Sequence, residues 1–271
     1  MQRWIVGIIV AAAAAATISA QTLYIPASAN ADGVNQTTWR TDLQIKAVAD
    51  APASFTIELL ETGVDNSEPA SVEHTIAAGE SLRLGNVLET GFEYSGTSAL
   101  RITATDGAIL ATSRTYNDDP AGTYGQTVPA VSESEAFPFG HDATLIQLSR
   151  SPDPSVGFRT NIGFVNAADS STAIEVDVFE SDGAHLGTLT RNLPPFGHRQ
   201  INDVFHAVGA DDVPDGYAIV GTTSENGRFI TYASVVDNGS GDAVFILGGL
   251  EVASVPLEPR LVVFESFMRP G

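Results

Sequence analysis

A ten-residue phrase occurs twice in the sequence, and this repetition constrains the fold more than any other feature. Residues 39–48 read WRTDLQIKAV and residues 158–167 read FRTNIGFVNA. Apolar and polar residues alternate in both copies, and a period of two is typical of a strand with one buried and one exposed face. The sequence therefore predicts the same strand in each half of the chain.

The agreement between the halves extends beyond this phrase. Four further pairs of segments correspond in order: 54–61 with 173–180, 80–88 with 197–205, 98–118 with 216–238, and 122–131 with 241–249. The dipeptides Asp106-Gly107 and Asn226-Gly227 at the centre of the third pair predict type I′ hairpins. The copies lie about 120 residues apart, too far for a solenoid unit and suitable for a whole sandwich domain.

We therefore predict an all-β chain with two tandem immunoglobulin-like antiparallel β-sandwich domains that arose by internal duplication. The expected domains cover residues 21–135 and 136–250, with the acidic stretch 132–142 as the linker. No stretch has convincing helical periodicity, although residues 201–210 could form a single turn.

Residues 1–20 have the pattern of a secretory signal peptide, with Arg3 before an apolar run and small residues up to Ala20. A membrane anchor is the alternative, but the run is shorter than the roughly 20 apolar residues that a span needs. No later segment reaches that length, so the mature form is expected to have no transmembrane span. We expect the protein to be secreted, extracellular or at the cell envelope.

Several phrases also carry a family resemblance. IPASANADGVNQTTWRTDL, SRTYNDDPAGTYGQTVPAV and FRTNIGFVNAADSSTAIEVDVFESDG resemble a widespread group of uncharacterised exported bacterial proteins that carry such phrases in tandem. The resemblance covers nearly all of the chain after residue 20, except the last stretch from Glu251. It implies an extracellular or envelope location and paired β-sandwiches, and it implies no chemistry.

Charge and cysteine content exclude several classes of function. The formal net charge is −20, from 33 acidic and 13 basic residues, so nucleic-acid phosphates would be repelled. The chain has no cysteine, which excludes disulfides and thiolate chemistry and leaves core burial to hold each domain together.

Catalytic motifs are weak. The five histidines (His74, His141, His185, His198 and His206) show no metal-site spacing and are interpreted as surface or turn residues. The string YSGTS (94–98) lacks the first glycine of a nucleophile elbow. A convergent triad on a sandwich stays open as an alternative. We predict no catalytic residues and no enzyme activity.

Clustered carboxylates form the weak candidates for calcium. Asp118 and Asp119 occupy the loop NDDPAG, and Asp237 and Asp242 occupy the corresponding loop DNGSGD. Calcium takes six to eight oxygen ligands, but neither loop has EF-hand spacing, and Asp, Asn and Gly also suit tight turns. We predict no cofactor, and calcium is the alternative that these loops suggest.

Other candidate sites have structural alternatives. Tyr116, Tyr124, Tyr217 and Tyr232 could form a platform for a glycan, but tyrosine also packs well on strands. Phe137 and Phe139 in the linker are expected to pack between the two domains.

The repeated Arg40 and Arg159 suggest a ligand, but a cross-strand ion pair is preferred, for example with Glu58 or Glu175.

The tail of residues 251–271 contains LVVFESF, a strand-like run between prolines. Such a strand could pair with its own chain, or it could add to a neighbour's sheet and make the tail a site for a protein partner or for self-association.

The sequence thus favours a non-catalytic exported structural, adhesion or binding protein that displays paired sandwiches at the cell envelope. The alternative is a carbohydrate-binding or enzyme-accessory module. A secreted hydrolase is the third hypothesis and would need histidine and carboxylate groups converging in one cleft.

Overall fold

The computed structural model describes residues 21–33, 37–48, 50–120 and 122–250. In this part of the chain the structure is almost entirely β, and every named pair of strands is antiparallel, which confirms the all-β prediction. The helices described are the short α1 (Val87–Phe92), α2 (Val204–Ala207) and the 3-10 turn η2 (Glu133–Glu135). None of the described helices is long and apolar enough to cross a membrane. The predicted signal peptide and tail lie outside the described residues.

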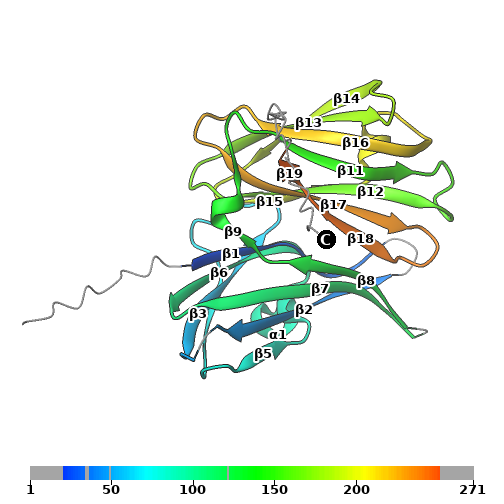
Figure 1. Ribbon diagram of the computed structural model, residues 1–271. Helices are drawn as coiled ribbons and strands as arrows, with labels where there is room; N and C mark the ends of the chain where they lie inside the picture. The colour runs from blue at the N-terminus through cyan, green and yellow to red at the C-terminus, as the bar shows by residue number, and fades with distance from the viewer. Residues whose placement is uncertain (1–20, 34–36, 49, 121, 251–271) are drawn as a thin grey trace, which may run out of the picture.

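The first half of the chain, residues 21–135, forms two facing layers (Figure 1). The first back sheet has the order β4 (Ser71–Ile76), β3 (Ala53–Glu61), β6 (Gly96–Asp106), β1 (Gln21–Asp32) and β9 (Val131–Ser132). The first front sheet has the order β5 (Ser81–Leu84), β2 (Thr38–Ala47), β7 (Ile109–Asp119) and β8 (Gly122–Pro129). The end of β1 also pairs with β2, so the two layers are continuous at one corner.

The second half, residues 136–250, repeats these pairings in the same order. The second back sheet is β14 (His185–Leu193), β13 (Thr172–Glu180), β16 (Val213–Thr222), β11 (Ala143–Arg150) and β19 (Gly249–Leu250). The second front sheet is β15 (His198–Ile201), β12 (Phe158–Asn166), β17 (Arg228–Asp237) and β18 (Ala243–Leu247). It also receives β10 (Phe137–Pro138), which pairs with β17. We call the surface of a front sheet that points away from the core of its own half the front face, and the corresponding surface of a back sheet the back face.

The threonine of the repeated phrase makes the same two backbone contacts in both halves. In β2, Thr41 is buried, its Oγ1 accepts a hydrogen bond from Ala29 N at 2.8 Å, and it donates to Ala29 O at 3.1 Å. In β12, Thr160 Oγ1 accepts from Ser149 N at 3.0 Å and donates to Ser149 O at 2.7 Å. Each threonine therefore satisfies one residue's backbone groups where the neighbouring strand crosses between layers.

The residue after that threonine is also used in the same way. Asp42 Oδ1 accepts a hydrogen bond from Asn86 N at 2.9 Å, and Asn161 Oδ1 accepts from Asp203 N at 3.0 Å. Asn86 and Asp203 precede α1 and α2, and both have positive φ, 42° and 48°. A side-chain acceptor thus fixes the strained entry to each short helix, which explains why Thr and Asp or Asn recur in this phrase.

The predicted type I′ hairpins are wrong. The strands on either side of Asp106-Gly107 lie in opposite layers, since β6 pairs with β1 and β3 while β7 pairs with β2 and β8. Asn226-Gly227 likewise lies between β16 and β17, which belong to opposite layers. Gly107 has positive φ (71°), but Asp106 and Asn226 do not. The dipeptides reverse the chain between sheets rather than within one sheet.

Other local predictions had mixed outcomes. The single turn expected within residues 201–210 is confirmed as α2. The helix α1 was not predicted, because its six residues are too few to show a helical period. The strands β4 and β14 were also missed, since both carry exposed polar side chains at the edge of a sheet.

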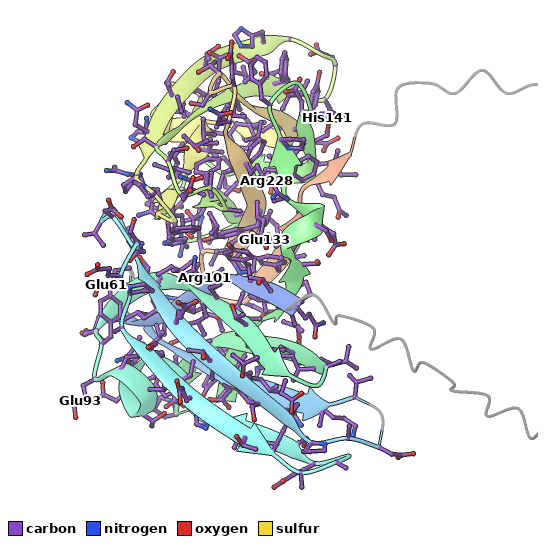
Figure 2. The ribbon with its side chains drawn as sticks, turned by 90° about the vertical axis from the view of Figure 1, so that its left-hand side faces the viewer. Glu61, Glu93, Arg101, Glu133, His141 and Arg228 are labelled. Atoms are coloured by element: carbon purple, nitrogen blue, oxygen red, sulfur yellow. The ribbon has the colours of Figure 1, made fainter. Side chains whose placement is uncertain are left out.

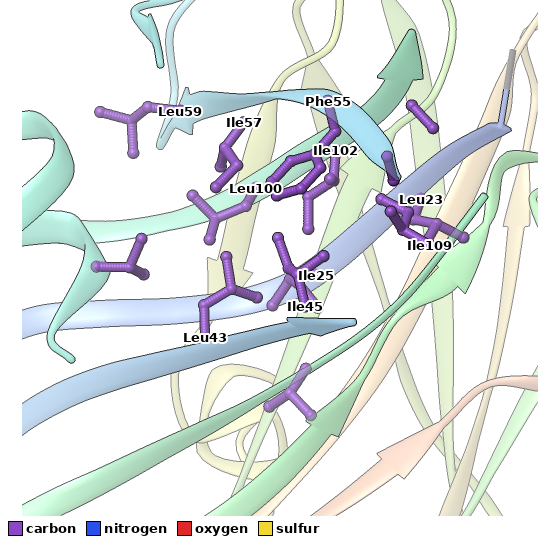
Figure 3. Close-up of a cluster of buried hydrophobic side chains, with 14 of the residues drawn as sticks. Leu23, Ile25, Leu43, Ile45, Phe55, Ile57, Leu59, Leu100, Ile102 and Ile109 are labelled. Atoms are coloured by element: carbon purple, nitrogen blue, oxygen red, sulfur yellow. The ribbon is translucent and has the colours of Figure 1, made fainter. Parts of the chain in front are cut away.

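Each half has its own apolar core between its two layers. The first core includes Leu23, Ile25, Leu43, Ile45 and Phe55, which converge between the sheets in Figure 3. The second core is built by the residues that face inward from the same strand positions, for example Ile162, Phe164, Ile174, Val176 and Phe229. The inward residues of the alternating pattern therefore lie where the sequence predicted them.

A third apolar cluster joins the two halves. The back face of the first half contributes Tyr24, Leu60, Ala99 and Val131, and the second half contributes Ala136, Val165, Ala167, Ile230 and Phe196. Backbone hydrogen bonds reinforce the contact, from Gly63 N to His198 O at 2.9 Å and from Asn66 N to Pro195 O at 3.0 Å. The front face of the second half thus packs on the back face of the first.

The linker segment contributes to this junction only in part. Arg228 donates a hydrogen bond to Glu133 O at 2.8 Å, and Figure 2 shows both residues close to Arg101 where the halves meet. Phe137 packs in the second core, stacked on Phe229 with ring centroids 5.5 Å apart. Phe139 is 48% exposed. The expectation that both phenylalanines pack between the domains is therefore wrong, since Phe137 is buried in the second core and Phe139 lies in the turn after β10.

Candidate functional site

A cleft of about 680 Å³ lies between the two halves. One wall comes from the first half, from Ala27 to Asp32 along β1 together with Trp39, Thr97, Thr115 and Gln126. The other wall is the front face of the second half, with Arg159 and Asn161 from β12, Gln200 from β15, and Tyr232, Ser234 and Val236 from β17. Neither sandwich alone encloses this space.

Tyr232 forms the floor of the cleft and depends on a glycine. Gly163 pairs with Tyr232 across the two strands, and a Cβ on Gly163 would lie 2.1 Å from the Tyr232 ring. The ring therefore lies flat over a position without a side chain. It also stacks on Phe245 with ring centroids 5.2 Å apart, and its hydroxyl donates to Gln200 Oε1 at 3.1 Å. Tyr232 is 1% exposed, so burial raises its pKa.

His198 connects the two halves through its ring nitrogens. Nδ1 lies 2.7 Å from Thr62 Oγ1 of the first half, and Nε2 lies 3.3 Å from the Tyr232 hydroxyl. The side chain is 1% exposed, and burial lowers its pKa to about 3. At neutral pH the ring is uncharged and serves as one hydrogen-bond donor and one acceptor between the hydroxyls of Thr62 and Tyr232.

Two arginines bring charge to the cleft. Arg159 is half-buried and donates from Nη1 to Asn238 Oδ1 at 2.9 Å. Burial lowers its pKa, although the charges of Asp203 and Asp237 oppose this change. Arg150 is paired with Asp203 at 3.0 Å. The cleft therefore presents a partly desolvated guanidinium among amide and hydroxyl groups, an environment suited to a polar ligand.

The preferred ion pair of the repeated arginines is wrong. Arg40 donates to Asn30 Oδ1 at 2.9 Å, and Arg159 donates to an asparagine as described above. The carboxylate of Glu58 instead binds Arg101, with N–O distances of 2.5 and 2.9 Å. The guanidinium of Arg101 also lies 4.4 Å from the centre of the Phe196 ring, so this pair belongs to the junction between the halves.

The calcium candidates lie at strand ends rather than within loops, except Asp242, which precedes β18. Asp237 Oδ1 accepts hydrogen bonds from Ser240 N at 2.7 Å and Ser240 Oγ at 2.8 Å, and these contacts lower its pKa. Asp242 Oδ1 accepts from Gly125 N of the first half at 2.9 Å. Asp118 and Asp119 lie at the end of β7. In the described part of the chain, no three His, Cys, Asp or Glu side chains gather as a metal site.

The histidine interpretation is wrong for His198, which is buried, whereas His74, His141, His185 and His206 are partly or fully exposed. His185 pairs with Asp177 at 3.1 Å on the back face of the second half. His206 lies 3.6 Å from Asp211. His198 pairs with Val165 on the face that the first half covers, and its own segment gives no sign of that burial.

The four tyrosines considered for a platform are not gathered together. Tyr232 is buried in the cleft, so its assignment to an exposed platform is wrong. Tyr217 stacks on Phe179 on the back face of the second half, with ring centroids 4.8 Å apart and planes 7° from parallel. Tyr116 lies on the front face of the first half, 5.0 Å from the guanidinium of Arg114. Sequence reasoning did not single out Trp39 as part of the cleft wall.

Comparisons with known proteins add little to this geometry. No protein-family model matches the chain, and no curated protein matches it. One solved structure with some likeness is Bacteroides uniformis beta-glucuronidase 2 covalently bound to cyclophellitol-6-carboxylate aziridine, with 12% identity and a TM-score of 0.14. The match covers 77% of this chain and 24% of that enzyme chain, so this chain spans about a quarter of its length. At this TM-score the likeness supports no conclusion.

Proposed function

We propose that the chain is a non-catalytic exported binding protein of the cell envelope, built from two immunoglobulin-like sandwiches that arose by duplication. Two features support the duplication. The strand neighbours recur in the same order in both halves, and the Thr and Asp or Asn of the repeated phrase make the same backbone contacts. Such contacts serve the framework, so the repetition itself argues for a structural unit rather than for a repeated active site.

The junction supports a rigid display of the two units. An apolar cluster, backbone hydrogen bonds and the buried contact from Ser234 Oγ to Gln126 Oε1 at 2.9 Å join the halves. Buried polar groups that are mutually satisfied fix one relative position of two surfaces more strictly than apolar contacts alone. The two sandwiches should therefore move as one body and hold the shape of the cleft.

The single observation that carries the binding function is the cleft that both halves enclose. Ligand sites occur preferentially at domain interfaces, in concave spaces of about 300–1,000 Å³ with a few convergent polar groups, and this cleft falls within that range. His198 lines it, but its ring nitrogens face hydroxyls and its low pKa leaves it neutral. This environment supports a positioning role in a framework, not proton transfer at neutral pH.

A carbohydrate is the ligand class that the lining favours. Trp39 offers an apolar ring at the rim, and Asn161, Gln200 and Arg159 supply amide and guanidinium groups for hydroxyls. Carbohydrate binding, the alternative that the sequence suggested, is therefore a more specific version of the proposed binding function. A hydrolase has less support, because the exposed pairs of His185 with Asp177 and of His206 with Asp211 do not line the cleft.

Trp39 provides a direct test of binding. The chain has two tryptophans, and Trp4 lies within the predicted signal peptide, so Trp39 is the only one in residues 21–271. We would titrate a panel of neutral and uronic oligosaccharides into this protein and record tryptophan emission. A saturable change that is lost in Arg159→Gln and kept in the matched variant Arg191→Gln, whose arginine does not line the cleft, supports the proposal. No response to any member, or an equal response in both variants, contradicts carbohydrate binding in the cleft.

A further inference from the structure

The molecule uses one front face and one back face to join its halves, and it leaves the other pair uncovered. The front face of the second half packs on the back face of the first. The front face of the first half and the back face of the second have no partner among the described residues. Their surface chemistry, position by position, indicates what would cover them.

The front face of the first half presents apolar side chains at the positions equivalent to those that the second half uses at the junction. Val165 pairs with Ile230 in the second half, and both are buried at the junction. The equivalent pair in the first half is Lys46 with Leu110, and Leu110 is 64% exposed. Val48 and Ala167 are equivalent, because the backbone N of Val48 donates to Ala108 O and the backbone N of Ala167 donates to Arg228 O. Val48 is 38% exposed, whereas Ala167 is 4% exposed.

The back face of the second half also presents apolar groups at the interface positions. In the first half, Leu60 pairs with Ala99, and both are buried against the second half. The equivalent pair on the back face of the second half is Phe179 with Tyr217, whose stacked rings remain partly exposed. Two faces that carry apolar groups at the positions of an existing interface are candidates for the same kind of contact.

The charges of the two faces are opposite. The front face of the first half carries Arg40, Lys46, Arg83 and Arg114 against two carboxylates, Asp42, which is paired with Arg83 at 2.7 Å, and Asp118 at the end of β7. These are four of the ten basic residues between positions 21 and 250, in a chain whose net charge is −20. The back face of the second half carries Asp142, Glu175 and Asp177. Complementary charges favour contact between these two faces over contact of either face with itself.

We propose that a second copy of this chain covers these faces, so that the front face of one copy's first half docks on the back face of the next copy's second half. The contact repeats between chains the packing that the two halves make within one chain. Leu110 and Val48 then meet the Phe179–Tyr217 stack, and the Lys46 ammonium lies near the rings and the Asp177 carboxylate. Because the two faces differ, the association is head-to-tail. This inference goes beyond the proposed cleft function and is independent of it.

The test uses residues 21–271 and two variants that each disable one face. The front variant is Lys46→Glu with Leu110→Glu, and the back variant is Glu175→Lys with Asp177→Lys. Sedimentation at physiological salt over a concentration series measures the mass. Glu68→Lys, an exposed change on neither face, is the charge control, and circular dichroism checks that every variant is folded.

A head-to-tail contact makes a specific prediction. The wild type and Glu68→Lys should gain mass with concentration, and each face variant should lose at least about tenfold in affinity, as loss of charge complementarity at an interface does. An equal mixture of the two face variants should associate more strongly than either variant alone, since the intact back face of the front variant can meet the intact front face of the back variant. Removal of residues 251–271 should leave the association in place.

Three results would overturn the proposal. The first is a wild type that stays monomeric at protein concentrations up to about 1 mM, because the dissociation constant of the contact would then be weaker than about 1 mM. The second is a mixture of face variants that stays monomeric while the wild type associates. The third is association that survives both face variants and disappears with residues 251–271, which would assign it to the tail.

Discussion

The two front faces of the molecule come from the same repeated phrase and differ in what covers them. In the first half, Gln44 and Lys46 point outward from β2 into solvent, and Asp42 on the same side is partly buried and paired with Arg83. In the second half, the same positions hold Asn161, which lines the cleft, Gly163, which lies under the Tyr232 ring, and Val165, which packs at the junction. The inward residues and the framework contacts are kept, while the outward residues are smaller and uncharged where a partner domain packs. Equivalent sheets of the two halves therefore differ in that one is uncovered within the chain and the other forms an interface.

The largest difference between these faces should be a dependence of the unfolding free energy on pH, and it should come from His198. The unfolded chain protonates this histidine near pH 6.5, while the folded ring stays neutral down to about pH 3. The unfolded state therefore binds more protons below pH 6.5, and stability falls as the pH falls. We expect a loss of about 1.4 kcal/mol of unfolding free energy per pH unit between pH 6.5 and 4.5.

Urea denaturation at several pH values measures this loss. The His198→Gln variant keeps a hydrogen-bonding side chain at the site, but this side chain does not ionise. The unfolding free energy of the variant should therefore not change between pH 6.5 and 4.5. The matched variant Ser81→Gln changes the equivalent position of the first front sheet, which is exposed, and should keep the wild-type slope. An unchanged slope in His198→Gln would mean that another group causes the acid dependence.

The next effect should come from Gly163. Its Ala variant places a Cβ against the buried Tyr232 ring, which cannot move because Phe245 and Gln200 hold it. We expect a loss of about 2 kcal/mol in unfolding free energy, as for overpacking in a core. The equivalent change on the free face, Gln44→Ala, should stay within about 0.5 kcal/mol of the wild type, as surface substitutions do. Chemical denaturation of both variants gives the comparison, and equal losses would contradict the assignment of the two faces.

A smaller effect should be the same in both halves. Thr41→Val and Thr160→Val each remove a hydroxyl that satisfies the backbone of the neighbouring strand. We expect each to cost about 1 kcal/mol, because a backbone N–H loses its acceptor. Thermal melts of the two variants should give similar shifts. A large cost in one half and none in the other would show that the two threonines are not equivalent.

The smallest effect concerns calcium. The carboxylates of Asp237 and Asp242 already accept hydrogen bonds from Ser240 and Gly125. We therefore expect no change in melting temperature on adding calcium to protein treated with a chelator, because a ligand that does not bind cannot stabilise. A saturable increase that is lost in Asp118→Asn with Asp119→Asn would instead assign the site to the first of the two loops.

Much of the framework could be predicted from the sequence. The alternation in residues 39–48 and 158–167 identifies the strands and their inward residues, because burial on one face enforces a period of two. The turn dipeptides were misread as hairpins, since a local reversal looks the same whether the next strand joins the same sheet or the opposite one. The outcome depends on which sheet offers a free neighbour, and no short stretch of sequence contains that information.

The cleft was harder to predict, because it lies between two units that are far apart in sequence. His198 and Tyr232 are buried by the other sandwich, and neither residue shows this in its own strand. One signal was available, since Gly163 and Val165 stand at outward positions where the first copy has Gln44 and Lys46. A face that loses its charged and polar side chains between two copies of one domain indicates an interface.

Calorimetric unfolding of residues 21–271 tests the central claim, that the two sandwiches form one body through an adapted front face. We expect a single transition in which the calorimetric and van't Hoff enthalpies agree, since neither half should retain its cleft wall once the other unfolds. Two separable transitions, or a van't Hoff enthalpy near half the calorimetric value, would show that the halves are independent domains and would contradict it.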